Sequence, residues 1–145
     1  MAYATLDDLK KALPEASLIA ITDDEDLGQV NVARAEAAIQ DADDVINSFL
    51  RGRHTVPLAL TPFPPIIRRI SVDLAIYFLY RRRIGMEPTD AMTASYKEAT
   101  RFLEGIRDGK NLLDDPAPII STGGIFKTNK TTDSRVFSSD VLDKY

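Results

Sequence analysis

The chain has 145 residues, of which 44% are hydrophobic, and a formal net charge of −4 at pH 7. This length is enough for one domain with a core of its own and too short for two domains that each have a substantial core. The sequence contains no cysteine, which excludes disulfides and thiolate metal sites, so stability must come from packing or from partners.

Charge is distributed unevenly along the chain. Residues 1–48 carry 3 basic and 11 acidic side chains, residues 49–109 carry 10 and 6, and residues 110–145 carry 5 and 5. Two interpretations stay open. The acidic and basic parts neutralise each other within one chain, or they form unlike faces that meet between subunits.

Residues 1–30 predict two short helices and a turn. The opening MAYATLDDLKK has neither the basic start nor the apolar run of a signal peptide, which favours a soluble protein that is intracellular when made. Thr5 is a suitable N-cap for a helix that ends near Leu13, and a second helical turn begins at Pro14. The acidic run 22–26 raises the hypothesis of a calcium site. It lacks the ligand spacing of an EF-hand loop, so we expect a solvated cap for the next helix.

From Val32 onward, apolar residues recur in steps of three and four, which predicts an amphipathic helix that Gly52 ends. The same pattern places Asp41, Asp43 and Asp44 largely on its outer face. The following segment, residues 51–65, contains four prolines and is expected to be an extended apolar strap or a contact surface.

The most apolar stretch, residues 64–83, predicts a central helix. Two prolines open it and three arginines close it, both of which suit the ends of a helix. Apolar residues cover nearly all of its circumference, which is typical of a buried helix. Arg68, Arg69 and Asp73 limit the uninterrupted apolar run to six residues, Leu74–Leu79, so the stretch favours a core helix and excludes a membrane span. A carboxylate here is costly unless paired, so we expect Asp73 to pair with a central arginine.

A last helix is predicted from Thr89 to Gly109, after which the composition changes. The fold class is therefore mainly α: a small helical bundle around a central buried helix in residues 1–113, followed by an extended C-terminal arm in residues 114–145. Short strands near Ile119 and Phe126, joined at Gly123-Gly124, give the arm a candidate β-hairpin. Apolar residues are scattered through the arm like anchors, among them Ile125, Phe126, Val136, Phe137, Leu142 and Tyr145.

Signatures of catalysis and cofactor binding are missing. His54 is the one histidine and has no cysteine or nearby carboxylate in sequence, so we expect no metal site and no cofactor. No nucleophile motif or phosphate-binding loop is present, which argues against an enzyme. A site assembled from Asp73, Tyr77 and His54 is the enzymatic alternative. The arginines favour helix capping and subunit salt bridges over a nucleic-acid surface, because phosphate binding needs them on one face.

Five segments in fixed order resemble a Mu-like bacteriophage family of head–tail connector adaptors. The segments are YATLDDL at residues 3–9, IAITD at 19–23, DADDVINSFLRGRHTVPL at 41–58, VDLAIYFLYRR at 72–82 and YKEATRFLEGIRDGKNLL at 96–113. Each segment alone is weak evidence for the resemblance, whereas the order of all five segments is fairly specific to the family. His54 departs from the family, where an aromatic residue such as tyrosine is expected in this loop.

This resemblance implies a structural protein of the virion neck, between capsid and tail, that is made in the host cytoplasm. It implies a ring, usually of twelve copies, that binds the portal protein and a downstream neck, stopper or tail protein, with DNA in the lumen held by no sequence-specific contacts. We expect acidic and basic faces to meet between subunits, and the predicted interface residues are Asp41, Asp43, Asp44, Arg51, Arg53, Arg81, Arg82 and Arg83. The arm is expected to dock on the portal through its apolar anchors. The alternative is a small helical DNA-binding protein, similar to a terminase small subunit.

Overall fold

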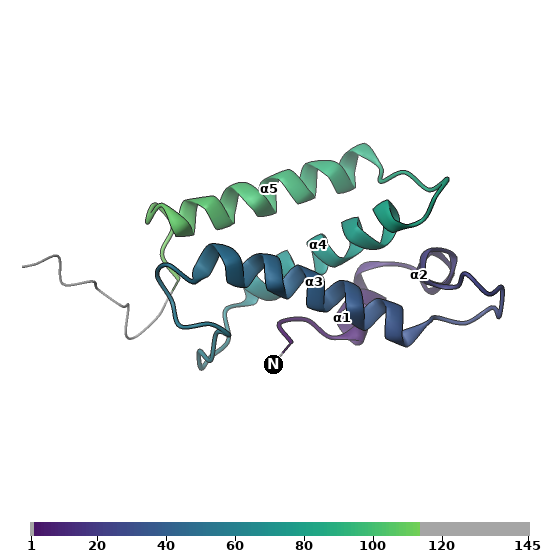
Figure 1. Ribbon diagram of the computed structural model, residues 1–145, viewed down its shortest axis with the longest axis horizontal. Helices are drawn as coiled ribbons and strands as arrows, with labels where there is room; N and C mark the ends of the chain where they lie inside the picture. Colours follow the sequence, from purple (N-terminus) through teal and green to yellow (C-terminus); the bar gives the residue numbers. More distant parts are fainter. Residues whose placement is uncertain (1, 114–145) are drawn as a thin grey trace, which may run out of the picture.

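The computed structural model describes residues 2–113, which form five helices and no strand (Figure 1). The helices are α1 (Leu6–Ala12), α2 (Glu15–Thr22), α3 (Val32–Leu50), α4 (Pro65–Arg82) and α5 (Asp90–Arg107). The mainly α fold class is thus confirmed. The predicted hairpin and the whole arm from residue 114 lie outside the described residues.

The helix ends follow the residues that marked them in the sequence. Thr5 caps α1 in a reciprocal capping box with Asp8, and the side chains of Asn31 and Thr89 accept from the first turns of α3 and α5. At the end of α5, Gly109 has φ +76° and donates to Ile106 O at 3.0 Å, while Lys110 donates to Gly105 O at 2.8 Å. This is a Schellman ending, which requires a residue that tolerates positive φ.

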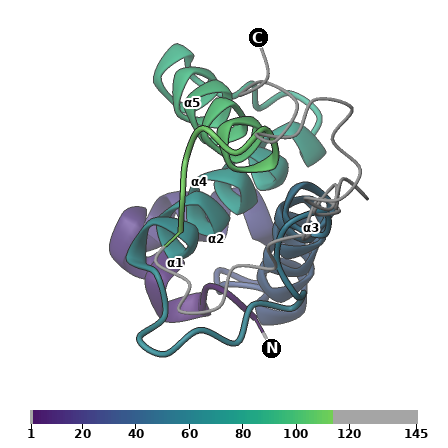
Figure 2. The same cartoon turned by 90° about the vertical axis from the view of Figure 1, so that its left-hand side faces the viewer.

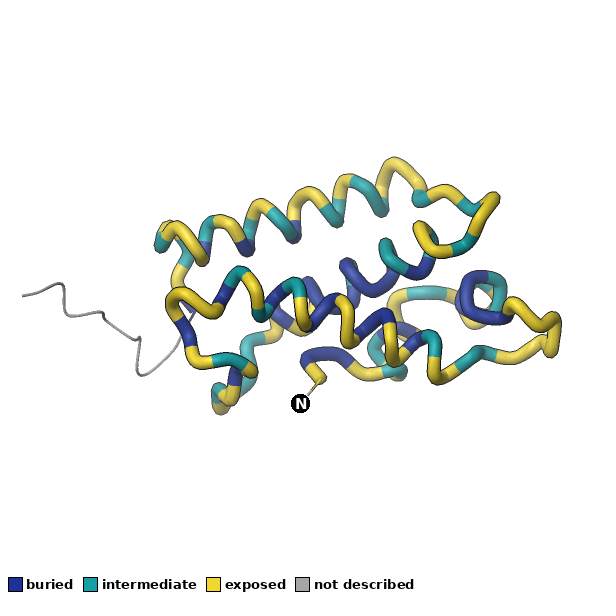
Figure 3. The backbone as a smooth tube through the Cα atoms, viewed as in Figure 1, coloured by how far each residue is buried: buried dark blue, intermediate teal, exposed yellow. Residues whose placement is uncertain are grey.

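Helix α4 is the centre of the bundle. It packs mainly against α3 and α5, and α1 and α2 cover its remaining sides (Figures 1 and 2). Its buried residues surround the helix, as Figure 3 shows in dark blue: Ile67, Ile70, Ser71, Val72, Leu74, Ala75, Ile76 and Leu79. The prediction of a buried central helix is confirmed. No helix within residues 2–113 is long and apolar enough to cross a membrane.

Helices α3 and α5 run in the same direction and opposite to α4 (Figure 1). Their C-terminal ends meet, since Arg53 Nε, just after α3, donates to Arg107 O at 2.8 Å. The Arg107 guanidinium also lies 5.9 Å from the centre of the Phe49 ring. This contact fixes α5 alongside α3 at one end of the bundle.

The segment between α3 and α4 is an irregular strap, as predicted. Leu58 of the strap is buried, and the backbone N–H of Leu58 donates to the Tyr3 hydroxyl at 2.8 Å. The Tyr3 ring also stacks on Phe63, with ring centres 5.6 Å apart. The strap therefore holds the N-terminal segment against the bundle.

Candidate functional site

A buried carboxylate joins the N-terminal segment to two helices. Asp43 on α3 is only 2% exposed, and it accepts from the Tyr3 backbone N–H at 2.9 Å and from Ser71 Oγ of α4 at 2.7 Å. The Tyr3 hydroxyl donates to Asn47 on the same face of α3. The prediction that Asp43 lies on the outer face is wrong, because residues 2–4 cover that side of α3.

Burial raises the pKa of Asp43, and the hydrogen bonds from Ser71 and Tyr3 lower it by less. Burial likewise raises the pKa of the Tyr3 hydroxyl. The two donors offset part of the free-energy cost of burying the carboxylate, as buried polar groups require. The arrangement positions the chain and presents no reactive group to solvent.

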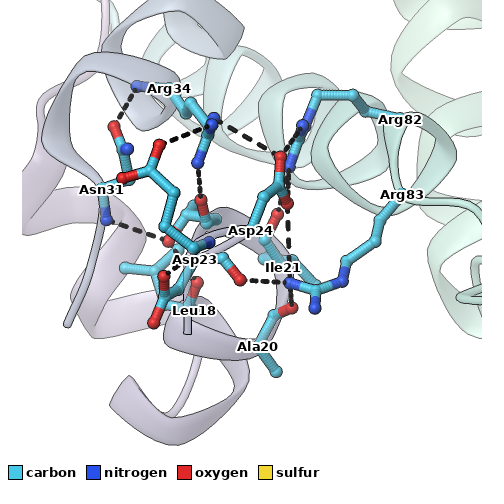
Figure 4. A network of polar contacts seen from close by, with 11 residues as sticks. Leu18, Ala20, Ile21, Asp23, Asp24, Asn31, Arg34, Arg82 and Arg83 are labelled. Atoms are coloured by element: carbon cyan, nitrogen blue, oxygen red, sulfur yellow. Dashed lines mark hydrogen bonds and ion pairs between the residues drawn. The ribbon is translucent and has the colours of Figure 1, made fainter. Parts of the chain in front are cut away.

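A second polar cluster joins the α2–α3 connection to the end of α4 (Figure 4). Asp24 accepts from Arg82 at 2.6 and 2.9 Å, and Arg34 Nε lies 3.5 Å from it. Arg82 also donates to Ile21 O, and Arg83 to Asp23 O at 2.7 Å and to Ala20 O. The hydrogen bond from Arg82 lowers the pKa of Asp24 to about 2.

The rest of the acidic run shapes its own loop. Asp23 is buried and accepts from the backbone N–H groups of Glu25 at 3.2 Å and Gly28 at 2.6 Å, and such backbone donors lower its pKa. The expected cap for the next helix is wrong, because Asn31 caps α3 and Asp23 is buried, whereas Asp24, Glu25 and Asp26 are exposed as expected of a solvated run. Among residues 2–113, no group of three or more His, Cys, Asp or Glu side chains could hold a metal ion.

The predicted interface residues fall into two groups. Asp41, Asp44, Arg51 and Arg81 are exposed, as is Arg53, which also holds the end of α5. Asp43, Arg82 and Arg83 are engaged inside the chain, which leaves little of them for a neighbour. The predicted docking residues of the arm lie outside the described part of the chain.

The three residues of the enzymatic alternative, Asp73, Tyr77 and His54, each pack or pair within the bundle. Asp73 lies 3.8 Å from Arg69 Nε one helical turn away, as expected for a pair with a central arginine. Burial raises its pKa, Arg69 lowers it and Glu98 raises it. Tyr77 stacks on Tyr96 with ring centres 4.2 Å apart, and His54 is buried directly after α3.

Sequence reasoning missed Tyr3, Ser71 and Asp24 as organising residues. Ser71 is a polar residue in an otherwise apolar run, a signal that could have suggested a buried hydrogen-bond partner. No local pattern links Asp24 to Arg82, because the two are brought together only when α2 packs on α4.

Large apolar side chains remain exposed at both ends of the bundle. Leu27 and Ile84, which are 64% and 102% exposed, lie in the α2–α3 and α4–α5 connections at one end (Figure 1). Leu112, which is 85% exposed, follows α5 at the other. An open hollow of about 470 Å³ lies beside the C-terminal half of α5, lined by residues such as Arg101, Phe102 and Asn111. Its lining mixes acidic, basic and apolar side chains.

Comparison with known proteins places this chain among phage proteins. The model of the family described as bacteriophage Mu, Gp36 matches residues 3–119. The chain is 34% identical over 111 residues to gene product J of Escherichia phage Mu, covering 76% of this chain and 74% of that protein. It is 33% identical over 95 residues to the Mu-like prophage FluMu protein gp36 of Haemophilus influenzae, covering 63% of each. The chain therefore belongs to the bacteriophage Mu Gp36 family.

Proposed function

We propose that this protein is a structural component of the virion, a head–tail connector that forms a ring beneath the portal in the phage neck. The ring carries DNA through its lumen and binds the portal on one side and a neck or tail protein on the other. The protein performs no chemical step in this role. Membership of a Mu-like phage family supports the proposal, as do the buried networks, which use polar residues to hold the bundle together.

The observation that carries the proposal is the exposure of large aliphatic side chains at both ends of the bundle. Leu27 and Ile84 at one end and Leu112 at the other are exposed and available to contact a neighbour. A connector stacked between two other rings has neighbours at both ends.

The experiment is to mix the purified full chain with the portal protein of the same phage and to image the product by negative-stain electron microscopy. The expected result is a ring coaxial with the portal, with a central opening wide enough for duplex DNA. Portal particles that stay unchanged at a large excess of this chain would contradict the connector role.

The DNA-binding alternative is tested in the same preparation. Arg82 and Arg83 already bind the α2–α3 connection, and Arg53 binds the end of α5, so these guanidinium groups are committed within the chain. Gel filtration with and without duplex DNA should therefore give the same elution of the chain. Co-elution of the chain with DNA at physiological salt would favour the alternative of a DNA-binding protein similar to a terminase small subunit.

A further inference from the structure

Helix α3 presents a charged stripe on the side opposite to its buried residues. Ala35, Ile39, Ala42 and Ile46 face the core, and the exposed positions half a turn away form one line along the helix. We call this line the α3 stripe: Ala33, Ala37, Asp41, Asp44, Ser48 and Arg51. Its charges are acidic in the middle and basic at the C-terminal end.

Helix α5 carries the opposite pattern on its own outer side. Ala99, Leu103 and Ile106 face the core, and the exposed line opposite to them is the α5 stripe: Asp90, Ala94, Lys97, Arg101, Glu104 and Asp108. Here the charges are basic in the middle and acidic at the C-terminal end.

The central charges of both stripes have no ion-pair partner within residues 2–113. No ion pair in this part of the chain involves Asp41, Asp44, Lys97 or Arg101, although Gln40 Nε2 donates to Asp44 at 3.2 Å. This contrasts with Arg82 and Asp24, which neutralise each other inside the chain. The central charges of the stripes therefore remain available to a partner, while Asp108 at the end of the α5 stripe already pairs with Arg107 and Lys110.

The two stripes match each other in a single register. Residue numbers differ by 57 for Ala37 and Ala94, for Asp44 and Arg101, and for Arg51 and Asp108. Two helices aligned side by side in the same direction with this offset place Ala37 beside Ala94, Asp44 beside Arg101 and Arg51 beside Asp108. In the same alignment Asp41 is level with Glu98, and Lys97 lies one position away.

We propose that the α3 stripe of one copy packs along the α5 stripe of the next copy in this register, which forms the lateral contact of the ring. The proposal rests on the ring of the proposed function and names the surfaces that close it. The stripes occupy separate corners of the bundle, as Figure 2 shows for α3 and α5, so one copy can use both at once.

The direction of the helices suits a ring. Helices α3 and α5 run the same way within one chain, and a rotation about an axis along the bundle leaves their directions unchanged, so α3 and the neighbour's α5 remain parallel (Figure 1). A contact between two different faces is heterologous and closes into a ring when the rotation allows. Exposed ion pairs add little affinity, so their role here is to set register, while the small residues allow close approach.

Introduced cysteines test the register, because the chain has none of its own. The variant A37C/A94C should give, on mild oxidation in the presence of portal, a reducible ladder of dimers, trimers and larger chains on a gel. The single variants A37C and A94C should stop at dimers. The matched control S48C/A94C shifts one site by 11 residues, about 16 Å along the helix, and should give no ladder.

Charge exchange gives a second readout. The variants D44R and R101D should each lose most rings in sedimentation, and the double variant D44R/R101D should recover them, because every contact then has opposite charges again. The control K10E, on exposed α1 outside both stripes, should assemble as the wild type does.

Two kinds of failure are separable. If the wild type forms rings on the portal but A37C/A94C gives no ladder, the α3–α5 register is wrong and the connector role stands. If the wild type forms no ring and no ladder appears, both proposals are wrong.

Discussion

At the scale of single residues, Asp43 shows how one carboxylate can hold a chain terminus in place. Its two oxygens accept from the Tyr3 backbone N–H and the Ser71 hydroxyl, which brings the N-terminal segment, α3 and α4 to one point. Burying a carboxylate is costly unless donors compensate it. We infer that the Asp43 carboxylate contributes more to positioning the N-terminal segment than to net stability.

Removing the Asp43 carboxylate should lower the free energy of unfolding more than neutralising its charge. The variant D43A leaves the Tyr3 N–H and the Ser71 hydroxyl buried without their partner, and we expect a loss of about 3 kcal/mol in the free energy of unfolding. The variant D43N keeps an acceptor for Tyr3 and can donate to Ser71 Oγ, so it should stay within about 1 kcal/mol of the wild type. Urea unfolding followed by circular dichroism measures both, and equal losses would mean that the network contributes nothing specific.

The same carboxyl should make stability depend on pH in an unusual direction. Its pKa in the folded protein is raised above the ordinary 3.8, so the folded state binds a proton more readily than the unfolded state. Its contribution to stability is therefore greatest below pH 3.8 and falls as pH rises through the raised pKa. Subtracting the pH profile of D43N from that of the wild type isolates this contribution, and a difference that grows with pH would refute it.

Asp24 should act in the opposite direction. Arg82 lowers its pKa to about 2, so its contribution is present above the ordinary 3.8 and is lost as pH falls from 3.8 toward 2. We expect D24N to lower the melting temperature at pH 7 and to have little effect near pH 2. The control D26N changes an exposed neighbour with φ +58°, a conformation that asparagine tolerates, and should leave the melting temperature unchanged.

At the scale of helices, the sequence predicted all five because caps and apolar spacing are local signals. Thr5, Thr89 and Gly109 mark ends that the structure confirms. The candidate site was harder to predict, since Asp43 fits an outer face until a distant segment covers it. The contact of Arg82 with Asp24 joins residues 58 positions apart, and no periodicity encodes such a contact.

Neighbouring positions on α4 should respond very differently to substitution. Leu74 is fully buried, whereas the Asp73 side chain is 29% exposed and lies 3.8 Å from Arg69. We expect L74D to cost at least about 3 kcal/mol, because it buries an unpaired charge and removes packing. The variant D73L should cost less than about 1 kcal/mol, since it removes a partly desolvated charge with a weak partner. Thermal denaturation of the two variants compares them, and equal losses would show that Asp73 and its pairing with Arg69 contribute as much to stability as the buried Leu74.

At the scale of the whole molecule, stability and assembly use different parts of the chain. Among the described residues, the core includes residues from every helix and from the strap. The charged stripes and the exposed aliphatic residues at the two ends lie outside that core. A surface variant can therefore remove assembly while the bundle remains folded.

The last prediction concerns residues 114–145, which we propose to be an arm that docks on the portal. The arm carries 4 basic and 5 acidic side chains, its prolines and glycines oppose long helices, and its apolar residues are too dispersed for a separate core. A segment of this kind can bind by adding a strand or by placing apolar side chains such as Phe126 and Phe137 into grooves of a partner. Because the helices and the buried residues of the described part, from Tyr3 to Leu113, all precede the arm, a chain truncated after Asp115 should keep its helical circular dichroism and melting temperature yet no longer co-sediment with portal. A truncated chain that unfolds would instead favour a hairpin folded back on its own bundle. Undiminished binding to the portal would show that the arm does not dock there, while leaving the lateral contact of α3 and α5 unaffected.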